Sequence, residues 1–289
     1  MQVSKPQESG GNYAPKEIYL GKCLYNVVAV NPNKEELKAL NLYVPAEEPV
    51  YTFKQDVNGV QKDAVSVVIY LKKTSDFSVV DRVTYNLVND HQLSSTGKFA
   101  VINKYGNDAW LEEEFITSEQ MPANMSWYLA EGVKKALRGE KELIAFIRAL
   151  SNFKNITSKS TEEERAGYVS IFEQKDLDKL LSGDVSDIKS VILSDPTLGV
   201  GFLLGAKTSD EGKVYQDLYK EYPLRKYMVA NEGSDEYIIK DLRSAQEAGK
   251  YSKTYFDMSS LAIKKYDPDL ALAETPSIFG EDSDNDPLF

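Results

Sequence analysis

Residues 50–71 read VYTFKQDVNGVQKDAVSVVIYL, and this stretch decides the fold. Two apolar runs, residues 50–57 and 60–71, are joined by Asn58-Gly59, a dipeptide that tolerates the positive φ angles of a type I′ turn. In the second run apolar and more polar residues alternate, which is typical of a strand with one face in a core. The apolar positions of this alternation are Val65, Val67, Ile69 and Leu71. The stretch predicts an antiparallel β-hairpin.

Strands are also predicted before and after this hairpin. Residues 22–30 are dense in Leu, Tyr and Val, and the following Asn-Pro-Asn ends the run and opens a short helix at 34–40, capped by Asn33. Residues 77–88 repeat the alternation, and residues 99–105 are a shorter copy of it. The first half of the chain is therefore predicted to be mostly sheet.

The pattern becomes helical after Trp110. Apolar residues at helical spacing predict one helix at 129–137, ended by Gly139, and a second at 143–150. The later elements are predicted as a helix at 177–181, strands at 200–206 and 214–222, and a helix at 236–248. The second half therefore begins with helices and returns to strands.

This order of elements predicts an α+β fold, a β-rich barrel of the OB type with a helical insertion at about 115–190. An OB barrel has five strands and a helix between the third and the fourth, which is where the helical block falls. Residues 1–17 predict a flexible N-terminal arm, and residues 18–265 form the OB-like domain. Residues 266–289, with seven acids and no base, predict a disordered acidic tail.

The charge of the chain is unevenly distributed. The 289 residues carry a net charge of −11, which by itself argues against a protein that coats nucleic acid. Seven of the 45 acids lie in the tail, so the other 38 acids and the 34 bases leave residues 1–265 with a net charge of −4. Much of the acidity is therefore local.

One cysteine, Cys23, and one histidine, His91, limit the available chemistry. They exclude a disulfide framework and a zinc site built from several thiolates, and they leave little for a histidine-based catalytic relay. The sequence has no glycine-rich phosphate loop, no signal-peptide core and no apolar run of the roughly 18 residues that a membrane span needs. We expect a soluble, cytoplasmic protein that is not an enzyme, uses no cofactor or metal, and does not enter a membrane.

The tail is the most informative stretch for function. Residues 277–289 read SIFGEDSDNDPLF, so flexible acids are followed by an apolar end. A partner can recognise such a peptide with an apolar pocket for Phe289, a base for its carboxylate and a basic rim for the acids. The predicted protein-docking residues are Asp282, Asp284, Asp286, Pro287, Leu288 and Phe289.

This tail resembles that of the single-stranded DNA-binding proteins of bacteria and their tailed phages. Bacterial members typically end in Asp-Asp-Asp-Ile-Pro-Phe, whereas this chain ends in Asp284-Asn285-Asp286-Pro287-Leu288-Phe289, with the proline one place earlier. Residues 207–219, KTSDEGKVYQDLY, resemble the late hairpin of the phage-type proteins. The resemblance implies an OB-fold body that protects single-stranded DNA during replication and recombination, in the host cytoplasm if the protein is phage-encoded. It also implies a tail that recruits partner enzymes and competes with DNA.

Two stretches combine bases with aromatic rings, as sequence-tolerant binding of single strands requires. The first supplies Tyr70, Lys72, Lys73, Arg82, Lys98, Lys104, Tyr105 and Trp110; the second supplies Lys207, Lys213, Tyr215, Tyr219, Lys220, Arg225 and Lys226. Trp110 fits a core position as well as a stacking platform. Residues 50–111 hold seven bases and six acids, so a positive groove would have to arise from folding.

A second hypothesis is a virion structural or cargo protein docked through its acidic tail. It requires no salt-sensitive affinity for DNA, and its tyrosines would anchor a protein interface. A nuclease would need a cluster of metal-binding carboxylates, and Asp267 and Asp269 have no evident partner. The sequence is also compatible with a homo-oligomer.

Overall fold

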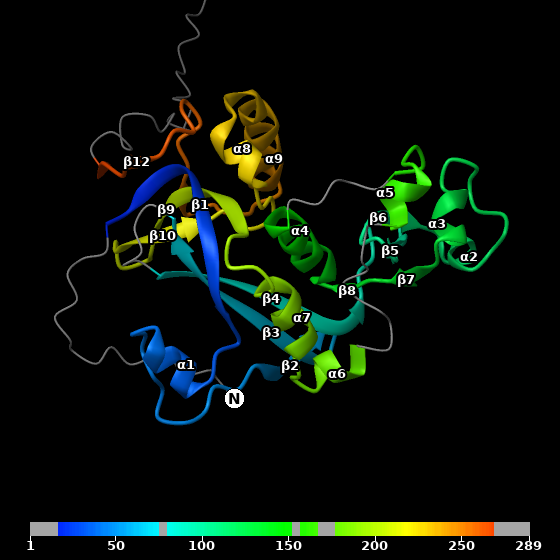
Figure 1. Ribbon diagram of the computed structural model, residues 1–289, viewed down its shortest axis with the longest axis horizontal. Helices are drawn as coiled ribbons and strands as arrows, with labels where there is room; N and C mark the ends of the chain where they lie inside the picture. Colours follow the sequence, from blue (N-terminus) through cyan, green and yellow to red (C-terminus); the bar gives the residue numbers. More distant parts are fainter. Residues whose placement is uncertain (1–16, 75–79, 152–156, 167–176, 269–289) are drawn as a thin grey trace, which may run out of the picture.

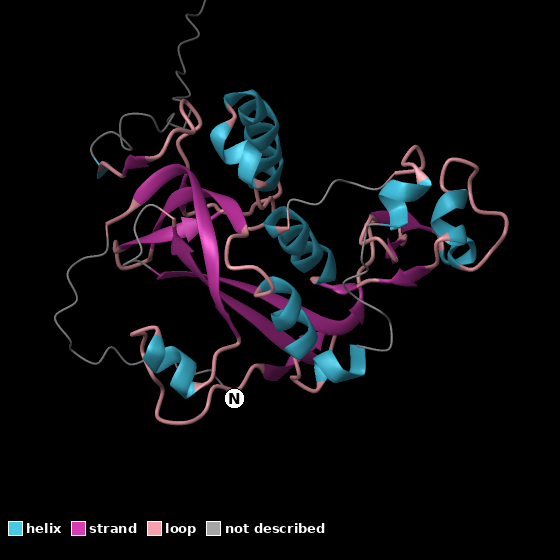
Figure 2. Ribbon diagram, in the orientation of Figure 1, coloured by secondary structure: helices cyan, strands magenta, loops and turns pink. Residues whose placement is uncertain are grey.

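The computed structural model describes residues 17–74, 80–151, 157–166 and 177–268 (Figure 1). Its larger sheet curls into a half-barrel (Figure 2). The strand order along the sheet is β10 (Val214–Leu218), β9 (Gly199–Thr208), β1 (Tyr19–Val30), β3 (Val60–Lys73), β4 (Val80–His91) and β8 (Leu137–Arg138). Three short strands complete it: β2 (Thr52–Val57) pairs with β3, β11 (Thr254–Tyr255) with β9, and β12 (Lys264–Lys265) with β1. The fold is α+β, as expected.

The predicted hairpin is confirmed as β2 and β3. Val57 pairs with Val60, and the two turn residues have φ angles of 54° at Asn58 and 81° at Gly59, as a type I′ turn requires. The inward face of β3 is fully buried at Val65, Val67, Ile69 and Leu71. The alternation in the sequence therefore identified the core face of the central strand.

The main core lies between the half-barrel and α4 (Glu140–Leu150), the helix that crosses its concave side (Figure 1). The ring of Phe146 lies 5.6 Å from that of Tyr85 on β4 and 6.2 Å from that of Phe202 on β9. Helices α6 (Leu177–Leu181) and α7 (Ser186–Ile192) add further apolar side chains. Aromatic packing therefore ties both halves of the sheet to one helix.

A second, smaller sheet has the order β6 (Asp108–Leu111), β5 (Phe99–Asn103), β7 (Val133–Lys135). It shares its own core with α2 (Glu113–Ile116) and α3 (Ser126–Ala130), and α5 (Glu162–Ala166) adds Arg165, which lies 5.7 Å from the ring centre of Trp127. These elements form the lobe on the right of Figure 1. Buried contacts of Ala100, Ile102 and Ala136 with Ile144 of α4 join the lobe to the main body.

A third group of elements covers the outer face of β9. It contains α8 (Lys226–Ala230), a short 3-10 helix (Glu232–Ser234) and α9 (Asp235–Glu247). Leu203 of β9 packs there with Ile238 and Leu242 of α9. Gly201 permits the close approach, because a Cβ at this position would lie 2.9 Å from Cβ of Leu224. Helix α1 (Lys34–Ala39), capped by Asn33 as predicted, lies beside the other end of the sheet.

Four local expectations differ from the structure. The helix expected at 129–137 ends at Ala130, because Gly132 has a φ of 80° and residues 133–135 form the edge strand β7. Gly139, with a φ of 85°, precedes α4 instead of ending a helix. The strand expected at 99–105 belongs to the small sheet, and the strand expected at 214–222 ends at Leu218.

The larger sheet is curled, as in the expected barrel, but among the described residues it does not close on itself. No strand pairing joins β10 to β4, so the half-barrel has an open seam between these two strands within the described ranges. The ordered body extends slightly beyond the predicted domain limits, since the Tyr266 N–H donates to the Ile18 carbonyl at 2.8 Å. The N-terminal arm up to residue 16 and residues 269–289 of the acidic tail lie outside the described residues.

Candidate nucleic-acid interface

A cavity of about 520 Å³ lies at the open seam between β4 and the segment that follows β10. Its walls come from β4, the ends of β9 and β10, and the loop after α9. The charged residues in the lining are the bases Arg82, Lys207, Lys220, Lys250 and Lys253 and the acids Asp217 and Glu221. Folding therefore brings bases from both predicted stretches to one place.

The side chain of Lys220 crosses the seam. Its Nζ donates a hydrogen bond of 3.0 Å to the carbonyl oxygen of Thr84 on β4. This contact links the two strands that the sheet leaves unpaired, and it places Lys220 beside Arg82, two residues from Thr84 along β4. The positive end of the cavity is therefore built from elements that are far apart in sequence.

The two acids of the cavity are held mainly by neutral donors. Asp217 accepts hydrogen bonds from the Thr254 hydroxyl at 2.7 Å and from a backbone N–H at 3.0 Å. Glu221 accepts from the hydroxyl of Tyr251 and lies 3.7 Å from Lys250. Burial and the hydrogen bond to Glu221 raise the pKa of Tyr251, so its hydroxyl remains a proton donor. The acids are therefore engaged without neutralising most of the bases.

Three of the five bases face solvent without a described ion-pair partner. Lys253 pairs with Asp210, and Lys250 lies near Glu221. Among the residues that the structure describes, no carboxylate lies within 4.0 Å of Arg82, Lys207 or Lys220, and all three side chains are exposed. These three side chains could hold an anion such as a phosphate.

Two tyrosines pair across neighbouring strands with bases of the cavity, although neither ring is part of its lining. Tyr70 is directly opposite Arg82 across β3 and β4, and it is half-buried. Tyr215 is directly opposite Lys207 across β9 and β10, and 48% of its surface is exposed. Lys72 lies two residues beyond Tyr70 on the same face of β3 and is half-buried. The cavity is therefore flanked by rings that could stack on bases.

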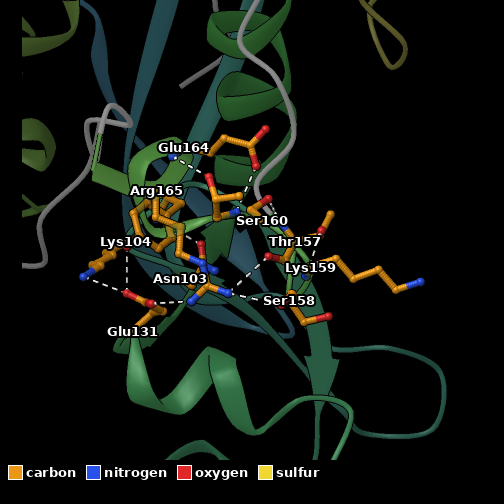
Figure 3. Close-up of polar contacts among 11 residues, drawn as sticks. Asn103, Lys104, Glu131, Thr157, Ser158, Lys159, Ser160, Glu164 and Arg165 are labelled. Carbon is orange, nitrogen blue, oxygen red and sulfur yellow. Dashed lines mark hydrogen bonds and ion pairs between the residues drawn. The ribbon is translucent and has the colours of Figure 1, made fainter.

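The other predicted residues of the first stretch lie in the small lobe, where carboxylates neutralise the bases. Lys98 lies 3.4 Å from Glu112, and Lys104 lies 2.7 Å from Glu131. The same Glu131 accepts from the Tyr105 hydroxyl and from Arg165 (Figure 3). The hydrogen bond from Lys104 lowers the pKa of Glu131, which keeps this carboxylate charged.

Trp110 has an intermediate position. It is 37% exposed on β6, and Nζ of Lys141 lies 4.5 Å from the centre of its ring. The ring is thus neither a core residue nor an open platform, since a cation already covers one face. Trp110 and its neighbours in the lobe are not part of the cavity lining.

Three predicted DNA contacts are buried and were wrongly placed on the surface. Lys73 lies two residues after Leu71 on β3, so its side chain is on the same inward face of the strand. It is 2% exposed, and its Nζ lies 4.3 Å from the ring centre of Tyr19. Tyr105 is buried in the lobe. Tyr219 follows the end of β10 and enters the core beneath α9, where its hydroxyl donates to Asp241 at 2.5 Å. A buried ring offers no face for stacking.

Three further predicted bases are described but do not line the cavity. Lys213 lies 3.7 Å from Glu211 in the turn before β10, while Arg225 and Lys226 lie at the start of α8. The predicted docking residues Asp282, Asp284, Asp286, Pro287, Leu288 and Phe289 lie outside the described residues. Of these predicted residues, Lys213, Arg225 and Lys226 are described, and none of the three is part of the cavity lining.

Sequence reasoning missed Lys250, Tyr251 and Lys253. A signal was present, because the segment Lys250-Tyr251-Ser252-Lys253 mixes bases with a ring in the same way as the two stretches that were selected. Its position just after α9 made it resemble a solvated helix end. Only the fold shows that this loop closes over the seam.

Comparison with protein-family models, with curated proteins and with solved structures found no match to the chain. Within the described ranges, no helix combines the length and the apolar character needed to cross a membrane. The same residues contain no group of three or more His, Cys, Asp and Glu side chains that could hold a metal ion. The seam cavity and its charges are therefore the features of the described residues that bear most directly on function.

Proposed function

We propose that this protein binds single-stranded DNA without strong sequence preference, with the strand lying along the seam cavity. The observation that carries the proposal is the convergence of Arg82 with Lys207 and Lys220, from opposite sides of the open seam, without described carboxylate partners. Bases arranged in a groove neutralise phosphates and release counterions, which supplies most of the affinity in sequence-tolerant binding.

The rings beside the cavity support the same proposal. A single strand exposes its bases, and each base stacked on an aromatic side chain contributes about 1–3 kcal/mol. Tyr215, beside Lys207, and Tyr70, beside Arg82, provide one ring on each side of the positive patch. A duplex presents no such faces, because its bases are already stacked, so we expect a preference for single strands.

We further propose that the half-barrel is an OB-type barrel opened at the seam, and that the acidic segment at 281–289 recruits replication or recombination enzymes. The resemblance of the tail and of the late hairpin to single-stranded DNA-binding proteins of bacteria and phages supports both parts. A barrel opened between β10 and β4 would present its binding cleft where the bases gather.

The test is a titration of fluorescently labelled oligo-dT with the full chain, with a duplex of matched length as the control. The three bases without a described carboxylate partner, in contact with phosphates, give a slope of log affinity against log salt of about −2, or about a 20-fold loss between about 50 and about 200 mM salt. We expect a preference for the single strand at both salt concentrations. Absence of single-strand binding at about 50 mM salt would reject the proposal and favour the tail-docked structural protein.

A further inference from the structure

Strand β2 has one edge that pairs with no other strand among the described residues. Its other edge pairs with β3, and Figure 1 shows β2 at the lower border of the half-barrel. The Ser66 N–H donates to the Tyr51 carbonyl at 2.8 Å, so every second residue, beginning with Tyr51, turns its backbone groups toward β3. The N–H and C=O groups of Thr52, Lys54 and Asp56 therefore point away from β3, and no described group bonds to them.

An unpaired edge is a template for another strand, and proteins usually protect it with proline, a bulge or charged side chains. Residues 52–57 read TFKQDV and contain no proline, and their pairing with β3 has no register shift. Lys54 is followed two residues later by Asp56, so the charges that repel one partner attract another. The edge is therefore protected against most strands, but not against a strand with the opposite order of charges.

The β2 strand of a second copy of the chain offers this opposite order. When two copies run antiparallel and are centred on Gln55, Lys54 of each copy lies opposite Asp56 of the other. These two residues also exchange backbone hydrogen bonds, because their N–H and C=O groups are the ones that point outward. On the other face of the strands Phe53 lies opposite Val57, and both side chains are half-buried in the single chain. The two-fold symmetry makes each of these contacts occur twice.

The charges also fix the register of the pair. Moving the centre by one residue, to Lys54 or to Asp56, places like charges directly opposite one another, which destabilises a strand pair. Lys54 bonds to Asp63 at 2.5 Å, but these side chains are 61% and 56% exposed, and such an ion pair contributes little. Asp56 accepts from the Gly59 N–H at 2.9 Å through Oδ1, and a carboxylate can accept further bonds. Both groups are therefore available to a partner.

We propose that two copies of this chain form a dimer by antiparallel pairing of their β2 strands, centred on Gln55. The contact extends the larger sheet across a two-fold axis, and it closes at two copies because both use the same edge. A single strand pair buries little surface, so the dimer is weak and reversible. No residue of β2 lines the seam cavity, so this inference does not rest on the proposed DNA binding.

The experiment is sedimentation equilibrium of the full chain between about 1 and about 500 μM, a range that covers weak dimers. Salt of about 150 mM gives a Debye length of about 8 Å, which screens the net charge of −11 while charges in direct contact still interact. We expect a reversible equilibrium between monomer and dimer, with no larger species.

Two charge reversals test the register. Lys54→Asp places acids opposite one another, and Asp56→Lys places lysines opposite one another. Each should weaken the dimer by about tenfold or more, since attractive pairs become repulsive on both sides of the axis. An equimolar mixture of the two variants restores opposite charges at both positions, so we expect mixed dimers with the affinity of the unaltered protein.

Lys240→Asp is the matched control. It makes the same change of charge as Lys54→Asp on the exposed surface of α9, which lies at the top of Figure 1, far from β2. This control should leave the dimer unchanged. The urea midpoint of each variant checks its folding, and rescue on mixing also requires folded chains.

The outcomes are distinct. Monomer alone at the highest concentration overturns the dimer. A dimer that neither reversal weakens overturns the assignment to β2, and one that both folded reversals weaken without rescue in their mixture overturns the register centred on Gln55. The oligo-dT titration measures DNA binding separately, so either proposal can fail while the other stands.

Discussion

The charge of the seam cavity predicts how the salt dependence of DNA binding responds to mutation. The change is the triple variant Arg82→Gln, Lys207→Gln and Lys220→Gln. These are the three lining bases that have no described carboxylate partner, so each can neutralise a phosphate. Each phosphate contact contributes about 0.7 to the salt slope for a single strand, so the slope should become shallower by about 2, from about −2 to close to zero.

The assay measures oligo-dT affinity by fluorescence anisotropy at several salt concentrations between about 50 and about 200 mM. The control is the triple variant Lys98→Gln, Lys104→Gln and Lys213→Gln, which removes the same number of positive charges. Each of these lysines already has a carboxylate partner, at 3.4, 2.7 and 3.7 Å respectively. We expect the slope of this control to change by less than about 1.

An equal change of slope in the two triple variants would contradict a special role of the seam bases. Such a result would show that total charge governs binding and that the seam has no special role. Lys220 also bonds the Thr84 carbonyl across the seam. The urea midpoint of each variant therefore has to be measured, and the comparison is made only at salt concentrations where both variants are folded.

Three further predictions concern stability. Tyr219→Phe loses a hydrogen bond to the half-buried Asp241 and should lower the free energy of unfolding by about 1–2 kcal/mol. Tyr85→Phe removes a hydroxyl that has no hydrogen-bond partner among the described residues, so the free energy of unfolding should stay the same or rise. Urea denaturation of the two variants and the unaltered protein measures both effects. Glu140→Ala removes a buried carboxylate that accepts hydrogen bonds from the Lys134 ammonium group and from the Leu137 N–H. The free energy of unfolding should fall by about 3 kcal/mol, which calorimetry would detect. Burial raises the pKa of the Cys23 thiol to about 11. The folded state disfavours the thiolate, so the preference of the fold for the neutral thiol contributes to stability. This contribution is intact below about pH 9 and is lost as the pH rises toward 11. The thiol should react with a maleimide at neutral pH only when the protein unfolds.

Much of the fold could be predicted from the sequence because the decisive signals are local. The Asn58-Gly59 turn, the alternation along β3 and the apolar face of α4 each depend on neighbours within a few residues. The segment at 133–135 was mistaken for helix, since its apolar spacing fits a helix. Its actual structure depends on pairing with β5, about thirty residues earlier in the chain, and spacing alone cannot reveal such a partner.

The candidate site could be predicted only in part. Arg82, Lys207 and Tyr215 were selected because they lie in basic and aromatic stretches, and they do reach the cavity or its border. Lys73 was selected on the same ground and is buried, because its parity along β3 turns it inward. The composition of a stretch shows which residues are present. The side of the sheet on which a residue lies depends instead on its alternation along the strand and on where the strand ends.

A positive cavity in a chain with a net charge of −11 follows from the way in which its acids are used. In the small lobe Glu131 is held by Lys104 and Arg165, so acids and bases cancel. At the seam five bases outnumber the two acids Asp217 and Glu221, so the lining keeps a formal charge of +3, that is 5 − 2. At physiological salt the Debye length is about 8 Å, so exposed acids elsewhere on the surface are largely screened from the cavity. The potential that a strand meets there is therefore decided by residues that come together only on folding, with Lys220 and Thr84 separated by 136 positions along the chain.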